Sequence, residues 1–250
     1  VIVLDPCYDS YEPNIELAGG RAVHVPLVPG TFRPDFARIA AALSPKTRAI
    51  IVNTPHNPSA TVWTEQDMQR LAELLRPTDV LLIADEVYEH MVYDGVRHES
   101  VARHEELAQR GFVVSSFGKT YHVTGWKVGY VAAPASLTAE FRKVHQFNVF
   151  TVNTPMQHAL AAYLGDPAHY LELPAFYQAK RDLLRRLLAG SRWRALPCAG
   201  TYFQLLDYSG IGDADDVAMA EELVSRHGVA AIPVSVLYER APRLRLLRFC

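Results

Sequence analysis

The sequence has little of what marks a membrane protein or a nucleic-acid-binding protein. Its 250 residues include three cysteines, Cys7, Cys198 and Cys250, which are far apart and lack metal-ligand spacing. We expect three reduced thiols and no metal site, as is typical of a cytoplasmic protein. No apolar run approaches the ~18–20 residues of a membrane-spanning helix. The formal net charge is −2 with dispersed basic residues, which argues against a nucleic-acid or membrane partner.

The chain does have enough apolar material for a large buried core. Hydrophobic residues make up 49% of it, an ordinary proportion for a globular protein. The length suits one large domain, or a large domain with a small one. The chain opens inside a predicted strand at residues 1–4 and closes inside another at residues 244–250. We therefore expect a piece of a longer protein.

Short apolar runs alternate with helical patterns along the chain. The predicted strands span residues 1–4, 22–27, 49–52, 80–84, 111–115, 128–133, 201–206, 229–232 and 244–250. Helices are predicted at residues 34–43, 64–76, 136–146, 153–164, 171–188 and 213–227, with a short one after residues 7–11. Thr64 and Ser136 are the expected N-caps of two of these helices. The apolar side chains of the helix at residues 171–188, Leu183 and Leu187 among them, are expected in a core or an interface.

Near-continuous apolar strands separated by helices predict an α/β fold. We expect a mostly parallel central sheet with helices on both faces. The last ~80 residues form a smaller C-terminal α/β unit of a size compatible with a separate domain. The predicted domains are therefore residues 1–170 and residues 171–250.

Polar residues of unusual kind follow three consecutive predicted strands. Strand by strand they are Asn53 and Asn57, Asp85 and Tyr88, and Ser116 and Lys119. Taken singly, Asn57 could fix a turn, Asp85 could cap a helix and Lys119 could be solvated. Ligands of open α/β sheets, however, bind at the carboxyl ends of strands. Three converging ends therefore predict a site.

This combination of groups suits one kind of ligand. A buried carboxylate beside a tyrosine, an asparagine and a lysine fits an aromatic nitrogen heterocycle that carries a phenolic oxygen and an aldehyde, as pyridoxal phosphate does. A lysine can bind such an aldehyde covalently, and an aspartate can keep the ring nitrogen protonated. A serine and a second lysine can hold the phosphate.

Three segments carry a resemblance to a known family. They read NTPHNPSAT at residues 53–61, ADEVYEH at residues 84–90 and SSFGKTYHVTGWK at residues 115–127. With them the chain resembles the fold-type I pyridoxal-phosphate aminotransferases of class I and II over nearly all its length. It is most similar to the methionine aminotransferases and their kin, the kynurenine and glutamine aminotransferases. The resemblance implies pyridoxal 5′-phosphate as cofactor, amino acid and 2-oxo acid substrates, and a homodimer.

The resemblance also implies roles for the residues around the cofactor ring. Lys119 matches the catalytic lysine, which binds the cofactor covalently and later moves a proton. Asp85 matches the partner of the pyridine nitrogen. Tyr88 and Asn57 match the groups that bond the ring oxygen, and Tyr8 matches an aromatic residue that stacks on the ring.

Further matches concern the phosphate and the substrate. Ser116 and Lys127 match phosphate ligands. Many relatives carry arginine where Lys127 stands, so the compact ammonium group of a lysine here replaces a guanidinium that can donate two parallel hydrogen bonds. Arg248 matches the arginine that clamps the α-carboxylate of the substrate, and Arg245, three residues earlier, is its rival.

The family's N-terminal region, which contributes to the phosphate site, has no counterpart before residue 1, and the end after residue 250 is also missing. The chain on its own is therefore expected to be inactive.

The function that this implies is reversible transamination of an L-amino acid with a 2-oxo acid. The aromatic residues near the site suit a large uncharged side chain, so methionine or an aromatic amino acid is the expected substrate. One alternative is a β-elimination lyase of the same fold that uses the same Lys119 and Asp85. Another is an effector-binding domain of a transcription regulator.

Overall fold

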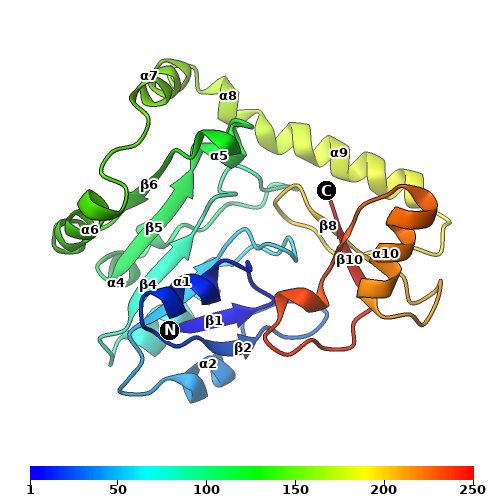
Figure 1. The fold of residues 1–250 in the computed structure, drawn as a ribbon, viewed down its shortest axis with the longest axis horizontal. Helices are drawn as coiled ribbons and strands as arrows, with labels where there is room; N and C mark the ends of the chain where they lie inside the picture. Colours follow the sequence, from blue (N-terminus) through cyan, green and yellow to red (C-terminus); the bar gives the residue numbers. More distant parts are fainter.

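The computed structural model describes residues 1–250 and contains two β-sheets (Figure 1). The larger sheet has the strand order β2-β1-β3-β4-β5-β6. Its strands are β1 (Ile2–Asp5), β2 (Val23–Pro26), β3 (Ala49–Asn53), β4 (Leu81–Asp85), β5 (Gly111–Ser116) and β6 (Gly129–Ala132). Only β6 runs antiparallel to its neighbour. The smaller sheet is antiparallel, in the order β7-β8-β10-β9. Its strands are β7 (Arg194–Ala195), β8 (Gln204–Asp207), β9 (Ile232–Pro233) and β10 (Leu246–Phe249).

Helices connect the strands and link the two sheets. The α-helices are α1 (Tyr11–Leu17), α2 (Phe36–Ala42), α3 (Glu65–Leu75), α4 (Glu105–Ala108), α5 (Phe117–Thr120), α6 (Ala135–Asn148), α7 (Thr154–Tyr163), α8 (Ala168–Leu171), α9 (Leu173–Leu188) and α10 (Asp216–His227). Short 3₁₀ turns are η1 (Val101–Arg103), η2 (Thr124–Trp126) and η3 (Ser235–Leu237). The long helix α9 leads from the large sheet to the small one, as Figure 1 shows. None of the helices combines the length and the apolar composition that a membrane crossing needs.

The main core lies between one face of the large sheet and the helices α2 and α3. It holds 22 buried residues, including Ile50, Leu82 and Leu71. In β4, Leu82 and Ala84 point into this core, because side chains alternate between the two faces of a strand. The predicted mostly parallel α/β sheet is confirmed.

The opposite face of the large sheet is covered less completely. Helix α1 contributes Ile15 to a small cluster with buried residues of β1 and β3. Farther along this face, Ile83, Phe112 and Val114 remain only half-buried. A groove runs between α1 and this face and reaches Tyr11 and Asp85. The carboxyl end of β4 is therefore accessible from this side.

Of the two N-caps expected from the sequence, the structure confirms one and contradicts the other. Thr64 caps α3 and forms a capping box with Asp67, as predicted. Ser136 is not a cap: α6 begins at Ala135, and its N-cap is Pro134. The reason is that Pro134 already accepts the first helical hydrogen bond, from the Thr138 amide at 2.8 Å.

Helix α9 buries a different face from the one expected. Leu187 is 72% exposed and Leu183 is 43% exposed, so they do not lie in the core of this chain, and their place in an interface stays a prediction. The residues that α9 buries are Tyr177 and Arg181. A buried arginine is tolerated here because its guanidinium pairs with the carboxylate of Asp94 and with a backbone carbonyl.

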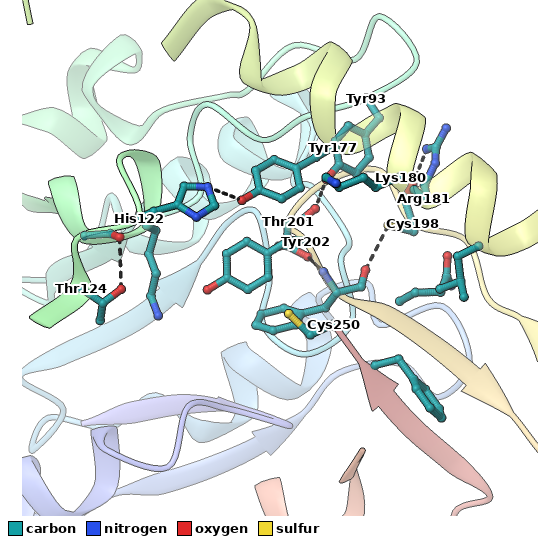
Figure 2. A pocket seen from close by; sticks show the side chains of 16 residues that line it. Tyr93, His122, Thr124, Tyr177, Lys180, Arg181, Cys198, Thr201, Tyr202 and Cys250 are labelled. Atoms are coloured by element: carbon teal, nitrogen blue, oxygen red, sulfur yellow. Dashed lines mark hydrogen bonds between the residues drawn. The ribbon is translucent and has the colours of Figure 1, made fainter. Parts of the chain in front are cut away.

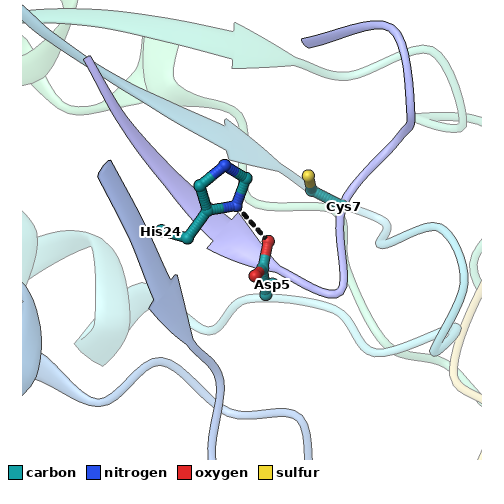
Figure 3. A group of neighbouring side chains, drawn as sticks. All are labelled: Asp5, Cys7 and His24. Atoms are coloured by element: carbon teal, nitrogen blue, oxygen red, sulfur yellow. Dashed lines mark hydrogen bonds and ion pairs between the residues drawn. The ribbon is translucent and has the colours of Figure 1, made fainter. Parts of the chain in front are cut away.

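Asp5, Cys7 and His24 form a cluster where β1 and β2 lie side by side (Figure 3). The His24 ring lies 2.8 Å from the Asp5 carboxylate through Nδ1, and its Nε2 lies 3.4 Å from Glu12. Burial lowers the pKa of His24, but the hydrogen bond with Asp5 and the charges of Asp5, Glu12 and Glu239 outweigh it and raise the pKa above 6.5. Protonated His24 is therefore stabilised by folding.

We predict that this cluster makes stability depend on pH. Because the pKa of His24 is higher in the folded state, its contribution is fully present below about pH 6.5 and is lost as the pH rises through the folded pKa. His24→Gln should remove about 1.5 kcal/mol of unfolding free energy at pH 6, the scale of a hydrogen bond to a charged group, and much less at pH 9. Urea unfolding at the two pH values measures this, with His227→Gln on the exposed end of α10 as control. An equal loss at both pH values would contradict the prediction.

Candidate active site

The polar strand ends predicted from the sequence lie around one cavity of about 340 Å³. In the pairing of β3 with β4, Asn53 lies opposite Asp85, and β5 ends nearby at Ser116. Seven residues assigned from the sequence to the cofactor line the cavity: Tyr8, Asn57, Asp85, Tyr88, Ser116, Lys119 and Lys127. The sheet thus gathers these side chains from five separate loops and strand ends.

Asp85 is a carboxylate with no cation beside it. Its Oδ2 accepts a hydrogen bond of 2.5 Å from the Tyr11 hydroxyl, and its Oδ1 accepts one of 3.3 Å from the Val87 amide. Burial raises the pKa of Asp85, while these hydrogen bonds and the charge of Lys119 oppose the rise. No helix begins at Asp85, so the capping alternative does not apply.

Hydrogen bonds fix the loop that carries Asn57. The Asn53 side chain donates to the Asp85 carbonyl at 2.9 Å and accepts from the Asn57 amide at 2.8 Å. The ring of His56 contacts the Ser59 hydroxyl at 2.6 Å and the Pro6 carbonyl at 3.0 Å. Burial lowers the pKa of His56 to about 4, so the neutral ring donates to Pro6. His56 therefore ties the Asn57 loop to the segment before Tyr8.

Tyr88 stands one turn beyond Asp85 and is almost fully buried. Its ring packs edge-on against Tyr202 and Phe203, with centroids 5.4 and 5.8 Å apart. Burial is the main reason that the pKa of Tyr88 is raised well above its usual value. The phenol therefore remains a hydrogen-bond donor at neutral pH.

A single helical turn, α5, presents Lys119. Ser116 is its N-cap and accepts from the Gly118 amide at 3.0 Å. The Thr124 hydroxyl donates to the Gly118 carbonyl at 3.1 Å and closes the turn from the other side. A Cβ at Gly118 would lie 2.8 Å from the Cα of Thr124. Only glycine lets these two backbone segments approach so closely.

Lys127 has an unusual backbone conformation. Its φ of +57° is left-handed, a region that non-glycine residues seldom occupy and that costs roughly 1–3 kcal/mol. Such strain is common at ligand sites. The turn brings Lys127 back to the cavity where Ser116 ends β5.

Arg248, in β10 of the small sheet, does not line the cavity itself but contacts Asn57, which does. Its Nη1 donates to Asn57 Oδ1 at 2.5 Å, and its guanidinium lies 4.2 Å from the ring centroid of Phe203. Burial lowers the pKa of Arg248. Its rival Arg245 lies elsewhere, paired with Asp213 at 2.5 Å. Of the two arginines, Arg248 is therefore the one beside the Asn57 loop.

Two residues of this site were not singled out from the sequence. Tyr11 bonds Asp85, and Thr124 lines the cavity while it braces Gly118. Tyr11 follows Tyr8 by three residues in a segment that opens a helix, which is the only sequence signal for it. Thr124 has none beyond its place in the motif.

A second cavity of about 450 Å³ adjoins the first and shares Lys119 and Thr124 with it. Figure 2 shows its aromatic lining, to which Tyr93, Tyr177 and Tyr202 contribute. His122, in the turn after α5, also lines it, with Nε2 2.8 Å from the Tyr177 hydroxyl. The second cavity therefore has five tyrosine and phenylalanine side chains on its walls, together with three cations, Lys119, Lys180 and Arg181.

The family model for aminotransferase class I and II matches residues 1–249 of the chain. The chain belongs to the class I and II aminotransferases. It is 51% identical to the methionine aminotransferase of Escherichia coli, over 100% of the chain and 65% of that protein. It is 36% identical to kynurenine–oxoglutarate transaminase 3 of Rattus norvegicus, over 100% of the chain and 62% of that protein. A crystal structure of the E. coli methionine aminotransferase matches with a TM-score of 0.97, 51% identity and coverage of 100% of this chain and 66% of the other.

Aminotransferases of this class depend on pyridoxal phosphate, and the residues present fit that cofactor. The half-buried carboxylate of Asp85 has no ion pair, and desolvation raises its pKa, so a cationic ring nitrogen would suit it. Asn57 uses Oδ1 for Arg248 and its amide hydrogens remain for an acceptor. Lys119, Ser116 and Lys127 line the same cavity.

We predict that Gly118→Ala disturbs the turn that carries Lys119. The added Cβ would meet Thr124 backbone at 2.8 Å, so one segment must move. We expect a loss of about 1–3 kcal/mol of unfolding free energy, as for other overpacked sites, together with weaker binding of pyridoxal phosphate. Gly125→Ala is the matched control, because a Cβ there meets nothing within 4 Å. Urea unfolding and cofactor titration of both variants measure the difference, and equal behaviour would show that the close approach is unimportant.

Proposed function

We propose that the protein containing this chain transfers an amino group between an L-amino acid and a 2-oxo acid, with pyridoxal phosphate as cofactor. The chain spans 65% of the length of its E. coli relative, so the activity of the whole protein is a proposal. The observation that carries it is the cavity lined by both Lys119 and the half-buried Asp85 carboxylate, which has no ion pair, with Arg248 bonded to Asn57 of its lining.

Each residue of the cavity has a proposed task. When bound, pyridoxal phosphate supplies an aldehyde that takes up the amino group and a ring that accepts the electron pair left at the substrate Cα. Asp85 bonds the ring nitrogen and keeps it protonated, and Tyr8 stacks on the ring. Tyr88 and Asn57 donate hydrogen bonds to the ring oxygen. The phosphate is bound by Ser116 and Lys127 through charge-assisted hydrogen bonds.

Lys119 has two proposed tasks at one atom. Its Nζ binds the cofactor covalently while no substrate is present. When it is not bound to the cofactor, the same Nζ would take the proton from the substrate Cα and would later return a proton to complete the transfer of the amino group. The rigid α5 turn, braced by Ser116 and Thr124, supports this because it fixes where the amine can reach.

Methionine or an aromatic amino acid is the proposed amino donor. The aromatic second cavity beside Lys119 suits a large uncharged side chain. Of the three cations that line it, Arg181 pairs with Asp94 and Asp182, Lys180 lies over the ring of Phe176, and Lys119 is assigned to the cofactor. The names of the E. coli and rat relatives support the same choice.

We further propose a division into domains at residues 1–170 and 171–250. The large sheet ends at Ala132 and the small sheet begins at Arg194, with α9 between them. The cavity is then lined by the first domain, and Arg248 of the second domain bonds Asn57 at its lining.

A homodimer and a cytoplasmic location complete the proposal. Apolar side chains on and after α6 are strongly exposed, with Phe147 86% and Phe150 78% accessible, which supports a subunit interface in this region. Cys7, Cys198 and Cys250 are all free thiols, which supports a reducing compartment.

The first test uses the whole protein with methionine and no acceptor. We expect the visible absorption of the bound cofactor to change and one equivalent of 2-oxo acid to form per site. Lys119→Ala should slow this half-reaction by at least about 10³-fold, the upper range for loss of an acid–base group. Lys143→Ala, an exposed residue paired with Glu140 on α6, is the control. Substantial turnover in Lys119→Ala would refute its role, and pyruvate from cysteine conjugates without an acceptor would favour the β-elimination alternative.

A second test concerns the carboxylate of the substrate. Arg248→Ala should raise KM for methionine about 10²-fold, because an ion pair with the α-carboxylate is lost, while cofactor affinity changes far less. Arg245→Ala should leave KM nearly unchanged, since Arg245 pairs with Asp213. Steady-state kinetics of both variants show which arginine binds the carboxylate of the substrate. A large effect of Arg245→Ala alone would mean that the other arginine binds substrate.

A further inference from the structure

Tyr11 contacts two residues of the proposed cofactor site, Asp85 and Tyr8, although no role was assigned to it from the sequence. It is the first residue of α1 and lines the cavity that holds Asp85 and Lys119. Its hydroxyl donates to Asp85 Oδ2 at 2.5 Å, across 74 positions of sequence. Its ring meets that of Tyr8 edge-on, with centroids 5.7 Å apart and planes at 86°.

The direction of the hydrogen bond between Tyr11 and Asp85 is fixed by charge. Burial and the neighbouring carboxylate raise the pKa of Tyr11 well above its ordinary value. The phenol thus keeps its proton and can only donate to the carboxylate. A donor on a buried carboxylate favours the ionised form of that group, and Asp85 must be ionised to pair with a protonated ring nitrogen.

The geometry of the carboxylate makes this donor important. The second contact to Asp85, from the Val87 amide to Oδ1, is long at 3.3 Å. Tyr11 is therefore the stronger of the two restraints on rotation of the carboxylate. Because α1 covers only part of its face of the sheet, few other groups hold the Asp85 side chain from that side.

We propose that Tyr11 is a positioning residue, which orients the Asp85 carboxylate toward the ring nitrogen of the cofactor and supports the stacking side chain of Tyr8. This rests on the proposed function, because it takes Asp85 to be the partner of that nitrogen. Tyr11 acts through Asp85 and Tyr8.

The test compares two cofactors on the cofactor-free whole protein. One is pyridoxal phosphate, and the other is its analogue in which C–H replaces the ring nitrogen. Dissociation constants are measured by visible absorption. The unaltered protein should prefer pyridoxal phosphate, and Tyr11→Phe should reduce this preference at least about 10-fold, since a hydrogen bond to a charged group is lost. Binding of the analogue should change little.

Matched variants separate the two contacts of Tyr11. Tyr11→Phe keeps the ring against Tyr8, whereas Tyr11→Leu removes it and should weaken the analogue as well. Tyr208→Phe removes a buried hydroxyl that donates to the Ala214 carbonyl at 2.9 Å in the small-sheet region, and should change neither constant.

The outcomes distinguish this inference from the proposed function. If Tyr11→Phe weakened both cofactors equally, its effect would be structural and the inference would be overturned. The same holds if the variant kept the full preference for pyridoxal phosphate. If instead the unaltered protein showed no preference, or Asp85→Ala preserved it, the assignment of Asp85 itself would fail.

Discussion

A buried carboxylate without a cationic partner is the constraint on which this site depends. Asp85 ends β4, where its half-buried side chain lines the cavity and has lost part of its contact with water. Burial raises its pKa, and the hydrogen bonds from Tyr11 and Val87 restore only part of the lost solvation. A cationic nitrogen bound at this position would supply what is missing, and in doing so it would be held protonated. The same desolvation thus destabilises the empty site and strengthens binding of one class of ligand.

The surroundings of Asp85 are rigid for reasons that are independent of one another. Asn53 bridges β4 to the Asn57 loop, and His56 ties that loop to the segment before Tyr8. On the other side, Gly118 and Thr124 pack closely and are joined by a hydrogen bond, which restricts movement of α5. A reacting lysine gains from such a frame, because a fixed amine loses little freedom when it reacts. The left-handed backbone at Lys127 indicates that part of the folding free energy is given up to complete the frame.

The sequence predicted the large sheet and most of the cavity because both follow local rules. Apolar runs locate the strands, and parallel strands must place their ends at one edge, so Asn57, Asp85 and Lys119 converge. The role of Tyr11 was not predicted, because its hydrogen bond to Asp85 depends on how α1 packs on the sheet. The spacing of residues in the sequence does not determine that packing. The choice between Arg245 and Arg248 also needed coordinates: positions an odd number apart face opposite sides of a strand, and a one-residue slip exchanges them. On α9, helical spacing identified an apolar face correctly, but pairing of Arg181 with Asp94 selected another face for burial.

The hydrogen bond from Arg248 to Asn57 joins the proposed binding residue of the substrate to a proposed binding residue of the cofactor. Asn57 faces the cofactor side of the cavity, and Arg248 enters from the small sheet. Arginine has five N–H donors in a fixed plane, and the bond to Asn57 together with stacking on Phe203 sets that plane while leaving donors free. A substrate carboxylate bound to those donors would then lie at a set distance from Asn57, which we propose as a ligand of the cofactor. Asn57 would thereby help to orient the substrate, through Arg248, as well as to hold the cofactor. Movement of the small sheet, which carries Arg248, would alter the binding of substrate and cofactor together.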